Sequence, residues 1–274
     1  MKQRLCRAAL AFSLMGSVRA QPPAPTYIPQ TKFSSGQDVQ PVFEGWLRNA
    51  DGTFTMVFGY FNRNWQEELA IPAGPDNKLE PGDSDRGQPT YFLPRRQQFI
   101  FRVQVPSDWG QKELIWTITA HGKTEKAYAQ LLPVEEISER MIMTRGGLNP
   151  GEDDPNQPPS ITMAPLSTAS VATPLTLTAL VTDDGLPKPR PAPKPRPGAQ
   201  SNTVVNRPRG LNVSWLEYKG PAKVTFDPPG MIMVSGGQAI TTARFAEAGT
   251  YVLRATANDG ALSTTTDVTI TVAH

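Results

Sequence analysis

Residues 249–272 hold two alternating runs that meet at the turn sequence Asn258-Asp259-Gly260, and this pattern restricts the fold more than any other feature. The apolar positions are Tyr251, Leu253, Ala255 and Ala257 in the first run and Val268, Ile270 and Val272 in the second. An apolar residue at every second position is typical of half-buried antiparallel strands. The sequence therefore predicts the closing hairpin of a β-sandwich.

A first domain is expected over residues 33–144. Its best hairpin joins residues 41–48 to 53–61 through Asp51-Gly52, with Phe54, Met56, Phe58 and Tyr60 on one face. Further strands are predicted at 98–105, where Phe99, Phe101, Val103 and Val105 alternate, at 113–120 and at 123–131. Residues 72–94 are dense in Pro, Gly and Asp and indicate a long loop with one short strand. Residues 134–144 suit either a short helix or a last strand.

A linker is expected at residues 145–159, which contain almost nothing apolar to bury. The second domain would then cover residues 160–273. Its predicted strands are 175–182, 211–218, 223–226, 239–245, 250–258 and 263–272. Residues 186–209 form a basic, proline-rich insertion between the first two of these strands. Alternating proline predicts an extended polyproline conformation with the charged side chains in solvent.

The second domain resembles the bacterial PKD-type Ig-like repeats. The resemblance rests on residues 174–185, on Val213-Ser214-Trp215, on residues 243–253 and on the Asn258-Asp259-Gly260 turn. The Trp-Asp-Phe-Gly-Asp-Gly motif of the best-known members is missing. The resemblance implies an extracytoplasmic sandwich, often found beside enzymes, adhesins or binding domains. The predicted fold class is therefore all-β, with two Ig-like β-sandwich domains in tandem.

Residues 1–20 have the features of a signal peptide. Lys2, Arg4 and Arg7 precede the apolar run 8–15, and small residues end at Ala20, after which cleavage is predicted. Residues 21–32 would then be a proline-rich lead-in. Cleavage removes four basic residues, so the formal charge changes from 27 − 25 = +2 to 23 − 25 = −2. It also removes Cys6, the one cysteine, and the near-neutral mature chain gives no argument for nucleic-acid binding. A periplasmic or secreted location is expected, with no transmembrane segment in the mature chain.

Three groups of residues are candidates for binding. The cations of the insertion, Lys188, Arg190, Lys194, Arg196, Arg207 and Arg209, could contact a protein partner or an anionic surface. Trp65 and Trp109 lie in polar loop sequences and, if exposed together, could stack on sugar rings. Asp183, Asp184 and Asp259 end strands and could supply oxygen ligands to Ca²⁺, although Asp-Gly turns also need these residues without an ion.

Catalytic chemistry finds little support. A Ser/His/Asp arrangement would depend on His121, which lies in a predicted turn, and zinc sites lack cysteine in the mature chain. The sequence therefore predicts no cofactor and a non-catalytic accessory module that binds a protein partner in the cell envelope. A carbohydrate-binding module is the first alternative. A hydrolase with an acidic site is the second, since Asp and Glu are plentiful.

Overall fold

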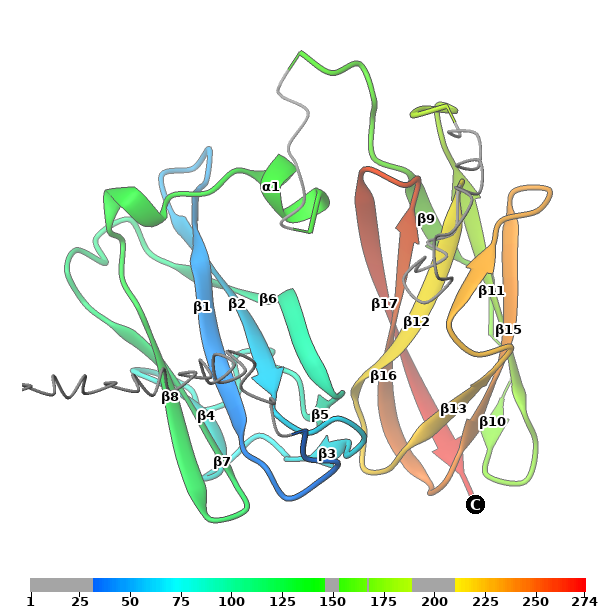
Figure 1. Ribbon diagram of the computed structural model, residues 1–274, viewed down its shortest axis with the longest axis horizontal. Coiled ribbons are helices and arrows are strands. Elements are labelled where there is room, and N and C mark those ends of the chain that lie inside the picture. Colours follow the sequence, from blue (N-terminus) through cyan, green and yellow to red (C-terminus); the bar gives the residue numbers. More distant parts are fainter. Residues whose placement is uncertain (1–31, 146–152, 167, 189–209) are drawn as a thin grey trace, which may run out of the picture. The chain divides into compact units, whose positions relative to one another are not determined.

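Strands dominate the part of the chain that the structure describes, and the two helices found there are short. The computed structural model describes residues 32–145, 153–166, 168–188 and 210–274, and Lys32–His274 form one compact unit. The helices are η1 (Pro133–Glu135) and α1 (Glu139–Met143). Figure 1 shows the strands gathered into two sets, β1–β8 and β9–β17. The predicted all-β class is confirmed, and we refer to the two sets as the N-terminal and C-terminal sandwiches.

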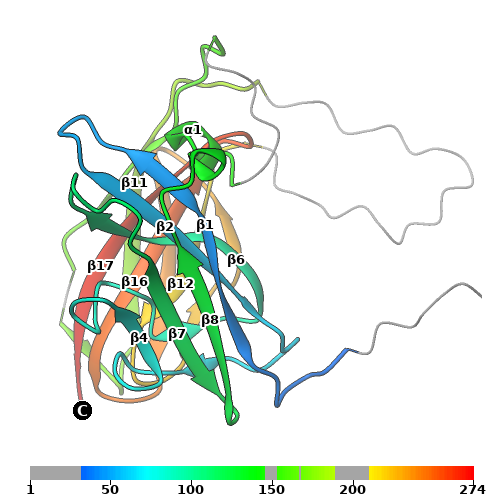
Figure 2. The same ribbon diagram turned by 90° about the vertical axis from the view of Figure 1, so that its left-hand side faces the viewer.

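The N-terminal sandwich contains a three-stranded sheet β1-β2-β6, a second three-stranded sheet β4-β7-β8 and the short pair β3-β5. Its strands are β1 (Val39–Arg48), β2 (Phe54–Asn62), β3 (Leu69–Ala70), β4 (Asn77–Glu80), β5 (Tyr91–Phe92), β6 (Arg95–Val105), β7 (Leu114–Ala120) and β8 (Lys123–Ala129). Every pairing in these sheets is antiparallel. Figure 2 shows β7 and β8 beside β1.

The predicted hairpins of the N-terminal sandwich are confirmed by the strand register. Phe54 opposes Arg48 across the first turn, where the Asp51 carboxylate accepts hydrogen bonds from the backbone N–H and hydroxyl of Thr53. His121 and Gly122 both have positive φ, 50° and 74°, as a tight turn between β7 and β8 requires. The inward residues Met56, Phe58 and Tyr60 are buried.

The predicted alternation in β6 is wrong at Phe99. The ladder with β2 shifts between Phe58 and Tyr60, and Phe99 adopts φ 52° at that point. Ile100 is buried in its place, while Phe99 is only partly buried. The irregularity redirects β6, because extra residues on one strand of a pair bend it locally.

Two other segments test the predictions. One differs from what was expected, and the other settles a choice between helix and strand. Residues 72–94 hold two short strands, β4 and β5, because Asn77, Leu79, Tyr91 and Phe92 are buried despite the turn-rich sequence around them. Residues 134–144 contain α1, so the helical alternative is the right one. The Ser138 side chain caps α1 by accepting a hydrogen bond from Met141 N.

The C-terminal sandwich pairs a five-stranded sheet, β10-β17-β16-β12-β14, with a four-stranded sheet, β13-β15-β11-β9. Its strands are β9 (Ser160–Met163), β10 (Ala169–Ser170), β11 (Leu175–Thr182), β12 (Asn212–Lys219), β13 (Val224–Asp227), β14 (Met231–Met233), β15 (Gln238–Phe245), β16 (Gly249–Asn258) and β17 (Ser263–Ala273). The six predicted strands are present within one residue of their expected ends. The short strands β9, β10 and β14 were not predicted.

The closing hairpin carries the core of the C-terminal sandwich, as the alternation predicts. Tyr251, Leu253, Ala255 and Ala257 have no exposed side-chain surface, and Ile270 and Val272 are buried across from them. Val268 is partly buried against the same core. No helix in the described residues is long and apolar enough to cross a membrane. The domain limits proposed from the sequence stay predictions, because residues 1–31 and 146–152 lie outside the described chain.

Candidate functional site

The two sandwiches meet where the end of β12 contacts the segment before β5. Tyr218 packs among the buried residues of the N-terminal core, although it belongs to the C-terminal sandwich. Its hydroxyl donates a hydrogen bond to Gly87 O, and its own carbonyl accepts one from Thr90 N at 3.1 Å. Lys219 and Lys223 add ion pairs to Asp85 and Glu68. Residues more than 125 positions apart in sequence therefore form one joint.

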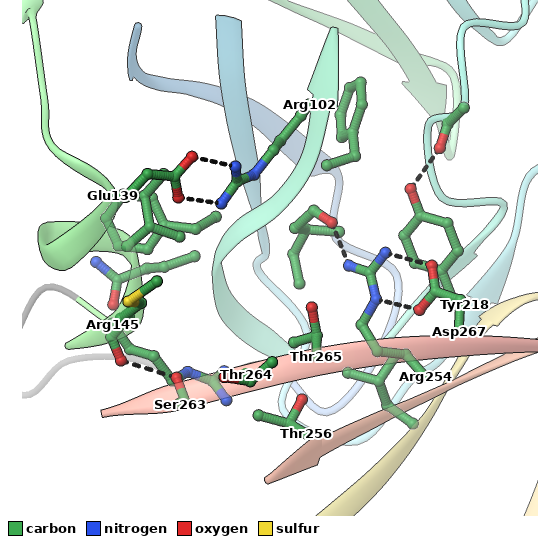
Figure 3. Close-up of a pocket in the computed structure, with 18 residues that line it drawn as sticks. Arg102, Glu139, Arg145, Tyr218, Arg254, Thr256, Ser263, Thr264, Thr265 and Asp267 are labelled. Atoms are coloured by element: carbon green, nitrogen blue, oxygen red, sulfur yellow. Dashed lines mark hydrogen bonds and ion pairs between the residues drawn. The ribbon is translucent and has the colours of Figure 1, made fainter. Parts of the chain in front are cut away.

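A cleft of about 490 Å³ lies beside this joint, lined by β6, α1, β12, β16 and β17 (Figure 3). Arg102 of β6 makes a bidentate ion pair with Glu139 of α1, at 2.6 and 2.8 Å. Arg254 of β16 makes another with Asp267, at 2.7 and 2.8 Å, and its guanidinium stands 4.0 Å from the Tyr218 ring centroid. The charges of these four side chains therefore neutralise one another in pairs.

Arginines also occupy the free edge of β6. Arg254 donates to Ile100 O, and Arg86 donates to Gln104 O at 2.8 Å. A free strand edge with open backbone groups invites pairing with other chains, and cations on that edge oppose it. The cleft is therefore best explained as a structural joint in which Arg86, Arg102 and Arg254 bond within the protein.

An aromatic–cation patch lies on the N-terminal sandwich, and we define it as Lys32, Phe33, Phe61, Trp65 and Arg95. Phe33 and Trp65 are 48% and 43% exposed. Lys32 Nζ and the Arg95 guanidinium stand 4.4 and 4.3 Å from the Trp65 ring centroid, and Arg95 also lies 4.7 Å from the Phe61 ring. Trp65 N donates to Phe33 O at 2.9 Å, so the two exposed aromatics are held by one backbone contact.

The prediction that Trp109 is exposed is wrong. Trp109 is 6% exposed, and its indole N–H donates to Lys112 O at 2.8 Å. Its ring fills the N-terminal core because residues 106–112 turn back on themselves. Trp65 and Trp109 are therefore not exposed together, as stacking of both rings on a sugar would require.

The second cleft, of about 440 Å³, is lined by residues 69–76 and 119–121. His121 lies at its rim, with Nε2 3.1 Å from Glu67 Oε2. That same carboxylate oxygen accepts a hydrogen bond from Gly36 N at 2.7 Å. His121 thus occupies the turn predicted for it and contacts a carboxylate that already holds the chain near Gly36.

The three aspartates considered for Ca²⁺ lie at one end of the C-terminal sandwich with residues 154–157. Asn156 Nδ2 donates to Asp259 Oδ2 at 3.2 Å, and Gln157 N donates to Asp184 Oδ2 at 2.9 Å. Burial raises the pKa of Asp183, and the nearby carboxylates of Asp259 and Asp184 raise it further. Among the described residues, no group of three or more His, Cys, Asp or Glu is arranged to hold a metal.

Most of the proline-rich insertion lies outside the described residues. Of its six candidate cations only Lys188 lies in the described residues, where it is exposed. Arg190, Lys194, Arg196, Arg207 and Arg209 fall in residues 189–209, outside the described chain. Their role in binding remains a prediction from the sequence.

Sequence reasoning missed Glu217, a carboxyl group that is 2% exposed. Its Oε2 accepts a hydrogen bond from Val224 N at 2.9 Å, and burial, followed by the charge of Glu68, raises its pKa to about 8. The signal was present, because Glu217 continues the inward alternation of Val213 and Trp215. Tyr218 carried no such signal, since Gly87 and Thr90, which its hydroxyl and carbonyl contact, belong to the other sandwich. The contact of Arg254 with Ile100 O was hidden for the same reason.

Comparison with known proteins gives only distant matches. No protein-family model matches the chain, and no curated protein matches it. A conjugative transposon lipoprotein from Bacteroides eggerthii aligns with 41% of this chain and 96% of its own, at 9% identity and a TM-score of 0.27. The D00-D0 domain of intimin aligns with 85% of this chain and 99% of its own, at 13% identity and a TM-score of 0.27. A chimeric titin Z1Z2-Z1Z2 tandem aligns with 87% of this chain and 97% of its own, at 13% identity and a TM-score of 0.24. These values assign no function to the chain.

Proposed function

We propose that this chain is an exported, non-catalytic accessory module that binds a protein partner in the cell envelope through the aromatic–cation patch. The observation that carries the proposal is Trp65, which is 43% exposed while Lys32 and Arg95 stand over its ring. Tryptophan and arginine are the side chains most enriched at the energetic centres of protein interfaces. Cation stacking restricts the Trp65 side chain before a partner arrives, which lowers the entropy cost of binding.

Backbone strain supports a functional role for Arg95. This residue has φ 68°, in the left-handed region that non-glycine residues seldom adopt. Such a conformation costs on the order of 1–3 kcal/mol and tends to occur where function requires a particular placement. Here it directs the guanidinium over Trp65 and Phe61, with a hydrogen bond to Arg63 O at 3.2 Å.

The charge of the patch indicates the chemistry of the partner. Lys32 and Arg95 are cations, and the nearby Arg63 is 3.6 Å from Asp38, which Lys123 also contacts at 3.1 Å. A partner segment with an apolar side chain beside one or more carboxylates would complement this surface. The six cations of the proline-rich insertion would assist by attracting the same acidic partner, and an anionic surface is the alternative use of that segment.

Glycan binding is the second candidate function, and exposed Trp65 is the feature that favours it. Two observations weigh against it. Trp109 is buried, and both cations stand over the ring that a sugar would have to cover. The third candidate, a hydrolase with an acidic site, would need free acidic groups in a cleft, whereas Glu139 and Asp267 are ion-paired in the larger one.

Two further parts of the proposal rest on the sequence. Export follows from the signal-peptide features of residues 1–20, with a periplasmic or secreted location as its consequence. The PKD-type relationship of the C-terminal sandwich rests on the resemblance of its strands and of the Asn258-Asp259-Gly260 turn.

Affinity capture from native envelope extract tests the proposal, with residues 21–274 as bait. The bait variants are Trp65→Ala, Arg95→Ala, deletion of residues 187–197, and Tyr128→Ala as a matched control. Tyr128 is an exposed aromatic on β8 of the same sandwich. We expect a stoichiometric protein that the control retains and that Trp65→Ala binds about 30-fold more weakly, as for an interface hot spot.

Three results would contradict the proposal. Retention of the partner by both patch variants would place the interface elsewhere, and its loss on deletion of 187–197 alone would assign it to the insertion. Recovery of cell-wall glycan without protein would favour the carbohydrate-binding alternative. Because Trp65 is exposed, its substitution should leave the melting temperature nearly unchanged, which separates lost binding from lost folding.

A further inference from the structure

Two buried oxygen atoms at one end of the C-terminal sandwich lack hydrogen-bond partners among the described residues. They are Asn156 Oδ1 and Asp183 Oδ1. Asn156 is 2% exposed, so bulk water does not compensate for the missing contact. A buried acceptor without a donor destabilises a fold, and an ion is one of the groups that satisfies such atoms.

Three segments distant in sequence contribute side chains to this end of the sandwich. Residues 154–157 precede β9, Asp183 and Asp184 follow β11, and Asp259 lies in the turn between β16 and β17, at the same end of the sandwich (Figure 1). The Asn156 amide contacts Asp259 directly, and Gln157 N contacts Asp184. The side chains that carry the two unpartnered oxygens are linked through Asp259, which accepts the Asn156 amide N–H and whose charge acts on Asp183.

Local turn geometry accounts for only some of the carboxylate oxygens. Asp259 Oδ1 accepts from the N–H groups of Ala261 and Leu262, and Asp183 Oδ2 accepts from Gly185 N at 2.9 Å. Asp184 uses both oxygens on backbone N–H groups. Asp183 Oδ1 and Asn156 Oδ1 remain without a hydrogen-bond donor, and Asp259 Oδ2 accepts one hydrogen bond, from the Asn156 amide at 3.2 Å. No histidine or cysteine is near these three residues in sequence.

Among the described residues, Arg140 of α1 is the cation found against this cluster. It lies 3.9 Å from Asp154 Oδ1 and donates to Asn156 O at 3.5 Å, while its Nε and Nη2 are buried without hydrogen-bond partners. Asp154, Asp183, Asp184 and Asp259 carry four formal negative charges against this single positive one.

We propose that Asn156, Asp183 and Asp259 bind a Ca²⁺ ion that ties residues 154–157 to the end of the C-terminal sandwich. Ca²⁺ takes six to eight oxygen ligands in irregular geometry, so backbone carbonyls and water would complete the shell. Mg²⁺ demands near-octahedral geometry and gives up water reluctantly, so it fits three loops of this kind less well. The site is independent of the partner-binding function.

Calorimetry and thermal unfolding of residues 21–274, stripped with a chelator, test this site. With the affinity usual for extracellular calcium modules, about 10 mM Ca²⁺ should raise the melting temperature by roughly 3–10 °C. The same concentration of Mg²⁺ should have a much smaller effect. Asp183→Asn and Asp259→Asn keep the turn-capping oxygen but remove the charge, and each should abolish the calcium-dependent shift and the binding heat.

Asp51→Asn is the matched control, because Asp51 caps a tight turn in the same way but lies in the other sandwich. It should retain the full response. The proposal is overturned if wild type shows no calcium-dependent heat or shift, or if both cluster variants keep them. A stabilised Asp183→Asn without any calcium response would show instead that Asp183 and Asp259 share a proton.

Discussion

Both sandwiches contain two main sheets, but they fill their cores in different ways. Large rings interlock in the N-terminal core, where Trp116 contacts Phe58, Phe92 and Phe101 with centroid distances of 4.7–6.3 Å. The C-terminal core instead places many alanines between its sheets, namely Ala179, Ala239, Ala243, Ala255 and Ala257. Close-packed interiors resist changes in volume in either direction. The first core should therefore be most sensitive to losing volume, and the second to gaining it.

The largest effect is expected for Trp116→Ala. Trp116 has no exposed surface, and its indole N–H donates to Asn77 Oδ1 at 2.9 Å. Truncation opens a cavity and leaves that buried oxygen without a donor, so unfolding in urea should show a loss of about 3–5 kcal/mol. Trp116→Phe keeps most of the ring and should lose less. A loss below about 1 kcal/mol for the alanine variant would show that the ring cluster can collapse around the gap.

The next effect concerns pH and the buried Glu217 of the C-terminal sandwich. Its pKa is raised from 4.5 to about 8, so the folded state binds the proton more tightly than the unfolded state. Protonation of Glu217 makes its full contribution to the free energy of unfolding below pH 4.5, and this contribution is lost as pH rises to about 8. The loss is on the order of a few kcal/mol, since each pKa unit corresponds to about 1.4 kcal/mol.

Glu217→Gln tests this effect, because glutamine stays neutral across the range. Urea unfolding at several pH values between 4 and 9 should show a smaller fall in stability for the variant than for wild type. Equal pH profiles would mean that Glu217 does not hold its proton in the folded protein. Glu80→Gln, at an exposed position in the N-terminal sandwich, serves as the control and should leave the profile unchanged.

The smallest of the three effects is expected for Ala255→Leu. Ala255 is fully buried opposite Trp215 in the ladder between β12 and β16. Three added carbon atoms must displace the facing sheet, so the free energy of unfolding should fall by about 1–3 kcal/mol. Thr269→Leu, at an exposed position of β17, should change it by less than about 0.5 kcal/mol. An unchanged stability for Ala255→Leu would show that the alanine-rich core has room to spare.

Regular alternation explains which parts of the fold were predictable. The runs ending in Val272 and at Ala120 place an apolar residue at every second position, and both became strands with the expected inward faces. Short strands such as β4 and β14 were missed, because three or four residues carry too little periodicity. Phe99 was misplaced because a shift in register reverses which side chains face inward, and single-sequence alternation contains no sign of such a shift.

The candidate sites were likewise predictable only where the signal lies in neighbouring residues. The loop context of Trp65 and Trp109 is similar in sequence, yet one ring is exposed and the other buried, because burial depends on how each loop folds back on the core. The aspartate turns were visible from their Asp-Gly chemistry. Their contact with Asn156 was not, since it joins positions 103 residues apart.

The sequence by itself determined the all-β class, the long strands of both sandwiches and the inward faces of most of them, because alternation and turn chemistry act over neighbouring residues. Only the tertiary structure decided that Tyr218 enters the other sandwich's core and that Arg254 joins β16 to β6. It also placed cations over Trp65 and brought Asn156 against Asp259. These contacts join residues far apart along the chain, and they form only where folding has already brought the sheets and loops together.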